Sequence, residues 1–125
     1  MSNKILITGA SGWLGKAFLR KIFDGPTSLN FSDIKLFIKD KSEEELLSAF
    51  IEKGVSFSYG DLTDKKSVDL FLENSEGATL FNLAGIIHPK LFNQSDFNLI
   101  NSIGVSYLAK KSIENGLKKF VSMSS

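Results

Sequence analysis

Short apolar runs alternate along this chain with longer segments in which apolar residues recur every three or four positions. The first pattern is typical of buried strands, and the second is typical of helices with one buried face. The short runs predict five strands, at 5–7, 34–38, 55–59, 78–83 and 119–123. The nearly all-apolar segment 78–83 is typical of a parallel strand that helices cover on both faces.

A helix is expected between each pair of successive strands. The apolar positions that mark these helices are Leu14, Ala17, Phe18 and Ile22 in the first, Leu46, Leu47, Phe50 and Ile51 as the buried stripe of the second, Val68, Phe71 and Leu72 in the third, and Phe97, Ile100, Gly104, Tyr107 and Leu108 on one face of the fourth, which is expected from about residue 96 to 115. Strict alternation predicts an α/β fold with a Rossmann-type doubly wound parallel sheet and helices on both faces. Right-handed crossovers give the strand order 3-2-1-4-5, with the ligand crevice at the switch point between strands 1 and 4.

The first strand runs directly into a turn with three glycines, Gly9, Gly12 and Gly15, and a helix follows. Their spacing is one residue longer at the front than the common dinucleotide fingerprint G-x-G-x-x-G, but the place between a strand and a helix is the same. In this interpretation Gly9 makes the sharp exit from the strand, Gly12 lets the backbone touch a pyrophosphate, and Gly15 lets the helix lie close to the sheet. The residues expected to bind cofactor in this turn are Gly9, Ala10, Ser11, Gly12, Trp13, Leu14 and Gly15.

Other interpretations of the turn fit it less well. A glycine-rich turn can bind nothing at all. A P-loop also ends in Gly-Lys, as Gly15 and Lys16 do, but Gly9 lies one residue too far from Gly15, and Ala17 replaces the hydroxyl that binds Mg²⁺. A flavodoxin-like or receiver domain shares the alternation of strands and helices but does not call for three glycines.

Composition and charge set limits on partners and location. The 125 residues are enough for one domain, and the net charge of +1, from 15 basic and 14 acidic residues, gives no overall field that would attract nucleic acid or an anionic membrane. No apolar run approaches the roughly 20 residues of a membrane span. The absence of cysteine removes disulfides and thiolate metal sites and fits a reducing compartment. We therefore expect a cytoplasmic protein with no metal, nucleic-acid or membrane partner.

Five sequence blocks follow one another in order: Thr8-Gly9-x-x-Gly12-x-x-Gly15, Gly60-Asp61-Leu62-Thr63, Asn82-Leu83-Ala84-Gly85, Asn101-x-x-Gly104 and Phe120-Val121-Ser122-Met123-Ser124-Ser125. Over the whole chain this ordered set resembles the extended short-chain dehydrogenase/reductases, the NAD-dependent epimerase/dehydratase family. The resemblance implies that Asp61 and Leu62 bracket the adenine of a bound cofactor. It also implies that Leu83, Ala84 and Gly85 line the nicotinamide-side ribose, that Ser124 lies beside the cofactor, and that Ser125 matches the catalytic Ser/Thr of the family.

The same resemblance implies an NAD(P)-dependent oxidoreductase, epimerase or dehydratase that acts on a nucleotide-sugar or a similar hydroxyl or carbonyl substrate. In such enzymes a Tyr-x-x-x-Lys pair, which moves the proton, follows the catalytic serine, and a substrate domain completes the fold. We therefore expect residues 1–125 to form an incomplete NAD(P)-binding domain that is inactive alone, binds its substrate only within a full-length enzyme, and is open to self-association through the bare edge of the fifth strand. The alternative is a module that binds NAD(P) as a sensor or partner and performs no chemistry.

Three residues invite catalytic roles that their positions do not favour. Tyr107 and Lys111 match Tyr-x-x-x-Lys, but the match precedes the serine strand and places Tyr107 on the apolar stripe of the fourth helix, where core packing is the expected role. His88 is the single histidine, and a His-Pro pair in a loop is expected to form a turn or the edge of a substrate site rather than to act as a base.

The choice of cofactor depends on the residues after the second strand, where a carboxylate would hold the ribose 2′-hydroxyl of NAD and a cation would hold the 2′-phosphate of NADP. Lys39 and Asp40 offer both, or are simply solvated loop charges. In relatives that end this strand in Arg-Asp, the arginine tends to meet the phosphate. We therefore expect NAD(P) binding with a preference for NADP through Lys39.

The substitution Lys39→Glu tests this expectation. It should weaken NADPH binding far more than NADH binding, because even a partly screened charge pair near 4 Å contributes on the order of a few kcal/mol. Titration of both reduced cofactors into both proteins measures the two losses. Equal losses would reject the role of Lys39.

Overall fold

The computed structural model describes residues 4–24, 30–83 and 105–122 of the chain. Within them lies a five-stranded sheet in the order β3-β2-β1-β4-β5, in which every neighbouring pair of strands is parallel. The strands are β1 (Ile5–Thr8), β2 (Ile34–Ile38), β3 (Ser56–Tyr59), β4 (Thr79–Asn82) and β5 (Lys119–Ser122). The predicted Rossmann-type sheet and its strand order are confirmed.

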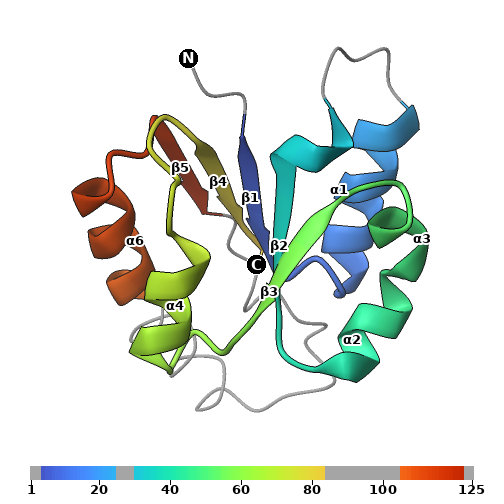
Figure 1. The fold of residues 1–125 in the computed structure, drawn as a ribbon, viewed down its shortest axis with the longest axis horizontal. Coiled ribbons are helices and arrows are strands. Elements are labelled where there is room, and N and C mark those ends of the chain that lie inside the picture. Colours follow the sequence, from blue (N-terminus) through green and yellow to red (C-terminus); the bar gives the residue numbers. More distant parts are fainter. Residues whose placement is uncertain (1–3, 25–29, 84–104, 123–125) are drawn as a thin grey trace.

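Helices cover both faces of this sheet. They are α1 (Trp13–Asp24), the 3-10 helix η1 (Phe31–Asp33), α2 (Lys41–Leu46), α3 (Ser48–Ile51), α4 (Lys65–Phe71) and α6 (Val105–Glu114). Figure 1 shows α1, α2 and α3 on one side of the sheet and α4 and α6 on the other. This division follows from right-handed crossovers, which change sides where the strand order reverses.

The core consists of two hydrophobic clusters, one on each side of the sheet. Successive residues of a strand point to opposite faces, so in β1 Leu6 joins the cluster that contains Phe71 of α4, and Ile7 joins the cluster that contains Leu19 of α1. The rings of Phe37 in β2 and Phe71 in α4 pack with their centroids 4.8 Å apart. The near-continuous apolar strands of the sequence therefore supply both clusters at once.

The second helix differs from the prediction. It begins at Lys41, where the carboxylate of Asp40 caps it by accepting a hydrogen bond from the backbone N–H of Glu43, and it is interrupted at Leu47 between α2 and α3. Leu47 is fully buried, whereas Leu46 was expected in the buried stripe and is 58% exposed. Leu47 lies at the break between α2 and α3 and enters the core, whereas Leu46 at the end of α2 faces outward.

Smaller corrections concern the first helix, the third strand and the ends of two elements. In α1 the exposed Ala17 contributes nothing to the core, and Leu19 is the residue that is fully buried. Val55 is buried but precedes β3, which begins at Ser56. The part of the fourth helix before Val105, with Phe97, Ile100 and Gly104, and the last residue expected in the fifth strand, Met123, lie outside the described residues.

A row of polar side chains crosses the carboxyl ends of three neighbouring strands. Thr8 in β1 is paired with Asn82 in β4, and Asn82 is paired with Ser122 in β5. The Thr8 hydroxyl donates a hydrogen bond to Oδ1 of Asn82, and Nδ2 of Asn82 donates one to the Ser122 hydroxyl over 3.2 Å. Thr8 and Asn82 are fully buried, so this row satisfies polar groups that have no access to water.

The substitution Asn82→Ala should lower the free energy of unfolding by about 1–3 kcal/mol, because it leaves the buried Thr8 hydroxyl without its acceptor. The matched control is Asn115→Ala, which removes an exposed amide outside this row and should change stability by less than about 0.5 kcal/mol. Urea denaturation measures both, as a shift of the midpoint at constant m-value. Equal shifts for the two variants would contradict the assigned role of Asn82.

Candidate functional site

The turn after β1 combines a left-handed glycine with the start of a helix. Gly9 has a φ of 78°, a backbone conformation that favours glycine. The N–H of Gly12 donates to the carbonyl of Gly9 over 3.2 Å and closes the turn, and the N–H of Lys16 donates to the carbonyl of Gly12 over 3.0 Å. Gly12 therefore directly precedes α1 and accepts the first backbone hydrogen bond of the helix.

Gly12 and Gly15 are glycines for different structural reasons. A Cβ on Gly15 would lie 2.2 Å from the carbonyl oxygen of Gly9 and 2.5 Å from Cα of Ala10, so only glycine lets α1 pass this close to the turn. A Cβ on Gly12 would meet only the carbonyl oxygen of Gly9, at 3.4 Å. Internal packing thus explains Gly15 but does not explain Gly12, whose exposed face is free for an approaching ligand.

The first turn of α1 also contains no acidic residue of its own. The first N–H groups of an α-helix have no partner within the helix and carry the positive end of its dipole. The first turn of α1 contains no acidic residue, and Gly12 has no side chain to cap it. By contrast, Asp40 caps α2 and Asp64 caps α4. The start of α1 is therefore suited to an anion.

The segment after β2 places Lys39 and Asp40 at the carboxyl end of the sheet, close to this turn. Both side chains are exposed. Asp40 accepts hydrogen bonds from the Ser42 hydroxyl at 2.6 Å and from the N–H of Glu43 at 3.2 Å. These bonds, that of Ser42 foremost, lower the pKa of Asp40, and the charge of Lys39 lowers it to a smaller extent. Asp40 is therefore a helix cap as well as a neighbouring charge of Lys39.

Glu43 is a residue of this region that the sequence analysis did not single out. Its carboxylate accepts a hydrogen bond from the Ser11 hydroxyl at 2.6 Å and another from the backbone N–H of Lys39 at 2.8 Å. It therefore ties the glycine turn to the end of β2. The spacing of Asp40 and Glu43 matches a capping box, the one sequence signal that could have pointed to it.

Asp61 and Leu62, which follow β3, differ in their exposure to solvent. The carboxylate of Asp61 accepts hydrogen bonds from the N–H of Thr63 at 2.8 Å and from its hydroxyl at 2.7 Å. The N–H bond foremost, and then the hydroxyl, lower the pKa of Asp61, with a smaller contribution from Lys39. Leu62 is buried in the core beside α4. Asp61 is therefore ionised at neutral pH and exposed, whereas Leu62 is part of the interior.

The remaining predicted site residues are buried, exposed or outside the described residues. Leu83 and Ala10 are buried against α1 and its neighbours, and the N–H of Leu83 donates to the carbonyl of Thr8 over 2.9 Å, so Leu83 extends the contact between β4 and β1. Trp13 is 64% exposed at the start of α1. Ala84, Gly85, His88, Ser124 and Ser125 lie outside the described residues.

The Tyr-x-x-x-Lys match in α6 has the packing role that was expected for Tyr107. The Tyr107 ring packs against the hydrophobic cluster shared with α4, and its hydroxyl donates to the carboxylate of Asp69 over 2.9 Å. Burial, and then Asp69, raise the pKa of Tyr107, the opposite of what a proton-transferring tyrosine needs. Lys111 is paired with Glu114 at 2.9 Å. Tyr107 therefore joins α6 to α4, whereas the ion pair of Lys111 lies within α6.

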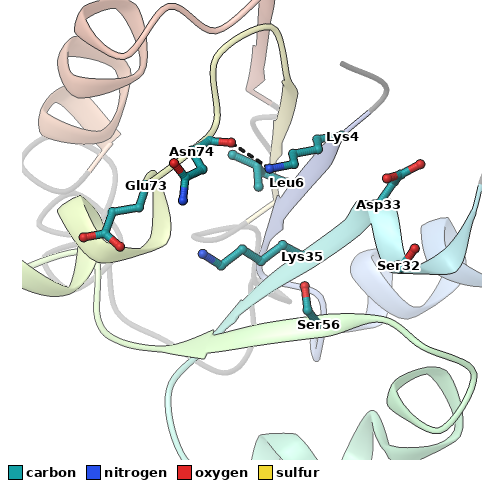
Figure 2. A pocket seen from close by; sticks show the side chains of 8 residues that line it. All are labelled: Lys4, Leu6, Ser32, Asp33, Lys35, Ser56, Glu73 and Asn74. Atoms are coloured by element: carbon teal, nitrogen blue, oxygen red, sulfur yellow. Dashed lines mark hydrogen bonds between the residues drawn. The ribbon is translucent and has the colours of Figure 1, made fainter. Parts of the chain in front are cut away.

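A pocket of about 340 Å³ lies at the amino ends of the strands, opposite the glycine turn (Figure 2). Lys35 reaches from β2 across the pocket and donates to the carbonyl of Phe71 over 3.1 Å, and Lys4 donates to the carbonyl of Asn74 over 2.8 Å. Burial lowers the pKa of Lys35. Both lysines donate to carbonyls at the end of α4. The residues that line this pocket therefore connect α4 to the sheet, and the pocket does not belong to the candidate site.

Fold and turn together define a Rossmann-type domain with a dinucleotide-type turn after its first strand. The chain belongs to the NAD dependent epimerase/dehydratase family, whose model matches residues 5–125. Within the described residues no group of three or more His, Cys, Asp or Glu side chains is placed to hold a metal ion. Among the same residues, no helix has the length and apolar character needed to cross a membrane.

Known proteins resemble the chain along nearly its whole length. It is 35% identical to the uncharacterized protein y4nL of Sinorhizobium fredii (strain NBRC 101917 / NGR234), over 97% of this chain and 34% of that protein. It is 27% identical to GDP-6-deoxy-D-talose 4-dehydrogenase of Aggregatibacter actinomycetemcomitans, over 93% of this chain and 32% of that protein. The chain thus spans about a third of the length of the curated relatives it matches.

The fold is similar to that of DesIV, a dTDP-glucose 4,6-dehydratase from Streptomyces venezuelae whose crystal structure holds NAD and TYD. The TM-score is 0.73 at 18% sequence identity, and the match covers 94% of this chain and 38% of that chain. At this identity the similarity shows the shared fold.

Alanine at each of two glycines separates packing from ligand contact. Gly15→Ala should destabilise the fold by about 1–3 kcal/mol, because its methyl group would overlap backbone atoms that cannot move aside. Gly12→Ala should cost less than about 1 kcal/mol but should weaken dinucleotide binding about tenfold or more, because its methyl group would cover the face offered to the pyrophosphate.

Thermal melts and cofactor titrations of the two variants check this pair. If Gly12→Ala bound dinucleotide as tightly as the unsubstituted chain, the role assigned to Gly12 would be wrong.

Proposed function

We propose that this chain is the NAD(P)-binding part of an epimerase, dehydratase or ketoreductase of the extended short-chain dehydrogenase type. The observation that carries the proposal is the open face of Gly12 at the start of α1, whose first turn contains no acidic residue. A Cβ there would meet one backbone oxygen only, so the protein itself gives no packing reason for glycine. A pyrophosphate gives one, because it needs bare N–H groups and the positive end of a helix dipole.

The proposed cofactor lies along the carboxyl ends of the strands. The turn from Gly9 to Gly15 holds the pyrophosphate, and Lys39 meets the adenosine ribose, with a preference for the 2′-phosphate of NADP. Asp61 and Leu62 bracket the adenine. The predicted lining of the nicotinamide side consists of Leu83, Ala84, Gly85 and Ser124. When bound, the nicotinamide accepts or donates a hydride.

We further propose a nucleotide-sugar, or a similar hydroxyl or carbonyl compound, as the substrate of the full-length enzyme. The names of GDP-6-deoxy-D-talose 4-dehydrogenase and dTDP-glucose 4,6-dehydratase, two proteins similar to this chain, support this class. Ser125 is the proposed catalytic serine. The 125 residues by themselves are proposed to be inactive, because Tyr107 and Lys111, their match to Tyr-x-x-x-Lys, are committed to contacts with Asp69 and Glu114.

The edge of β5 supports a further part of the proposal, self-association of the isolated chain. β5 is the last strand of the sheet, and its partner among the described strands is β4 alone. An exposed strand edge offers unpaired backbone groups to a second copy.

Fluorescence of Trp13 tests the proposed binding directly. Trp13 is the single tryptophan of the chain, and it lies 64% exposed at the first residue of α1. Titration with NADH or NADPH should quench its emission in a saturable way, with energy transfer to the reduced nicotinamide. ATP with Mg²⁺ should leave the emission unchanged, because the turn has neither the length nor the hydroxyl of a P-loop.

The control variant for this titration is Trp13→Phe, which should lose the signal at the protein while the fluorescence of the bound nicotinamide still titrates. Absence of saturation with both reduced cofactors would overturn the proposed function.

A further inference from the structure

The Glu43 carboxylate connects three segments of the candidate site. It belongs to the first turn of α2, and its two oxygens accept hydrogen bonds from two other segments. Oε1 accepts from the Ser11 hydroxyl in the glycine turn at 2.6 Å, and Oε2 accepts from the backbone N–H of Lys39 after β2 at 2.8 Å. Both distances are short, as expected for hydrogen bonds to an ionised acceptor.

The same two donors are also suited to a ribose 2′-phosphate. In a dinucleotide-binding Rossmann domain, the adenosine ribose lies between the glycine turn and the end of the second strand, the two segments that Glu43 connects. A ribose 2′-phosphate is an acceptor with two negative charges and needs local O–H and N–H donors. The Ser11 hydroxyl and the Lys39 N–H are such donors, and the Glu43 carboxylate already occupies both.

The negative charges around Lys39 also disfavour a bound 2′-phosphate. Lys39 is the cation assigned to the ribose, but its side chain lies close enough to Asp40 and Asp61 to act on both carboxylates. Glu43 adds a third carboxylate at the backbone of Lys39 itself. The three carboxylates repel a phosphate. They do not repel a neutral ribose 2′-hydroxyl, which can donate a hydrogen bond to a carboxylate oxygen.

We propose that Glu43 is a specificity-determining residue of the proposed cofactor site, where its carboxylate takes the place of a 2′-phosphate and thereby opposes the preference for NADP that Lys39 confers. This inference rests on the proposed function. Glu43 differs from a carboxylate placed directly after the second strand to hold the ribose, because it acts from α2 by withdrawing two donors.

The capping-box role of Glu43 is the competing explanation. A residue that only supports the start of α2 contributes to stability and leaves the choice between two cofactors unchanged. The ratio of the NADPH and NADH dissociation constants therefore separates a specificity role from a merely structural one.

The test is Glu43→Gln, with Glu45→Gln as the matched control. Gln retains the size of the side chain and an acceptor oxygen but removes the charge, and Glu45 is an exposed residue of the same helix. In titrations followed through Trp13 fluorescence, Glu43→Gln should tighten NADPH binding by about tenfold and change NADH binding by less than about twofold. Glu45→Gln should change neither by more than about twofold.

Adding Ser11→Ala to Glu43→Gln should remove part of the gain for NADPH, because the hydroxyl that Glu43 releases is then missing. Ser11→Ala alone retains the Glu43 charge and tests the inference even if Glu43→Gln fails to fold. It should leave the ratio of the two dissociation constants unchanged, because the hydroxyl is already donated to Glu43.

Three results would overturn the inference while the proposed function stands: an unchanged ratio in Glu43→Gln, an equal gain in Glu45→Gln, or a selective loss of NADPH binding in Ser11→Ala. If the unsubstituted chain bound neither cofactor, the proposed function itself would fail, and this inference would fall with it.

Discussion

The close passage of α1 over the turn after β1 is the constraint on which the rest of the site depends. It exists because Gly15 has no Cβ where one would stand 2.2 Å from the carbonyl of Gly9. With α1 held there, the exposed Gly12 lies at the start of the helix, at the carboxyl end of β1. A larger residue at position 15 would tilt the helix, and the ligand-facing surface would move with it. The packing of one glycine therefore sets the position of the proposed binding surface at another.

The sheet supports this arrangement because its strands are buried on both faces. Leu6 and Ile7, adjacent in β1, serve opposite clusters, so β1 is fixed by helices on both sides. The side chains that leave the carboxyl ends of β1, β2 and β3 are then held in one layer. This explains how the Glu43 carboxylate reaches Ser11, and how the charge of Lys39 acts on Asp61, across positions far apart in the sequence.

Much of the fold could be predicted from the sequence, because burial on both faces requires apolar runs such as 34–38 that are recognisable without any partner. The strand order followed from handedness. Helix breaks were harder to predict, since Leu46 and Leu47 are equally apolar and only the core decides which one it buries. The link from Glu43 to Ser11 was not predicted, because it joins residues 32 positions apart through side-chain geometry. Leu62 shows a further limit, since a residue expected beside the adenine is also part of the core.

The row of Thr8, Asn82 and Ser122 has a consequence for the register of β5 in the sheet. Side chains alternate along a strand, so a slip of β5 by one residue would present Val121 or Met123 to the amide of Asn82 in place of a hydroxyl. An apolar neighbour cannot accept that amide hydrogen, so the slipped alignment is penalised even though its backbone ladder is equally complete. Three small polar side chains thus help to specify the register of β5 against β4.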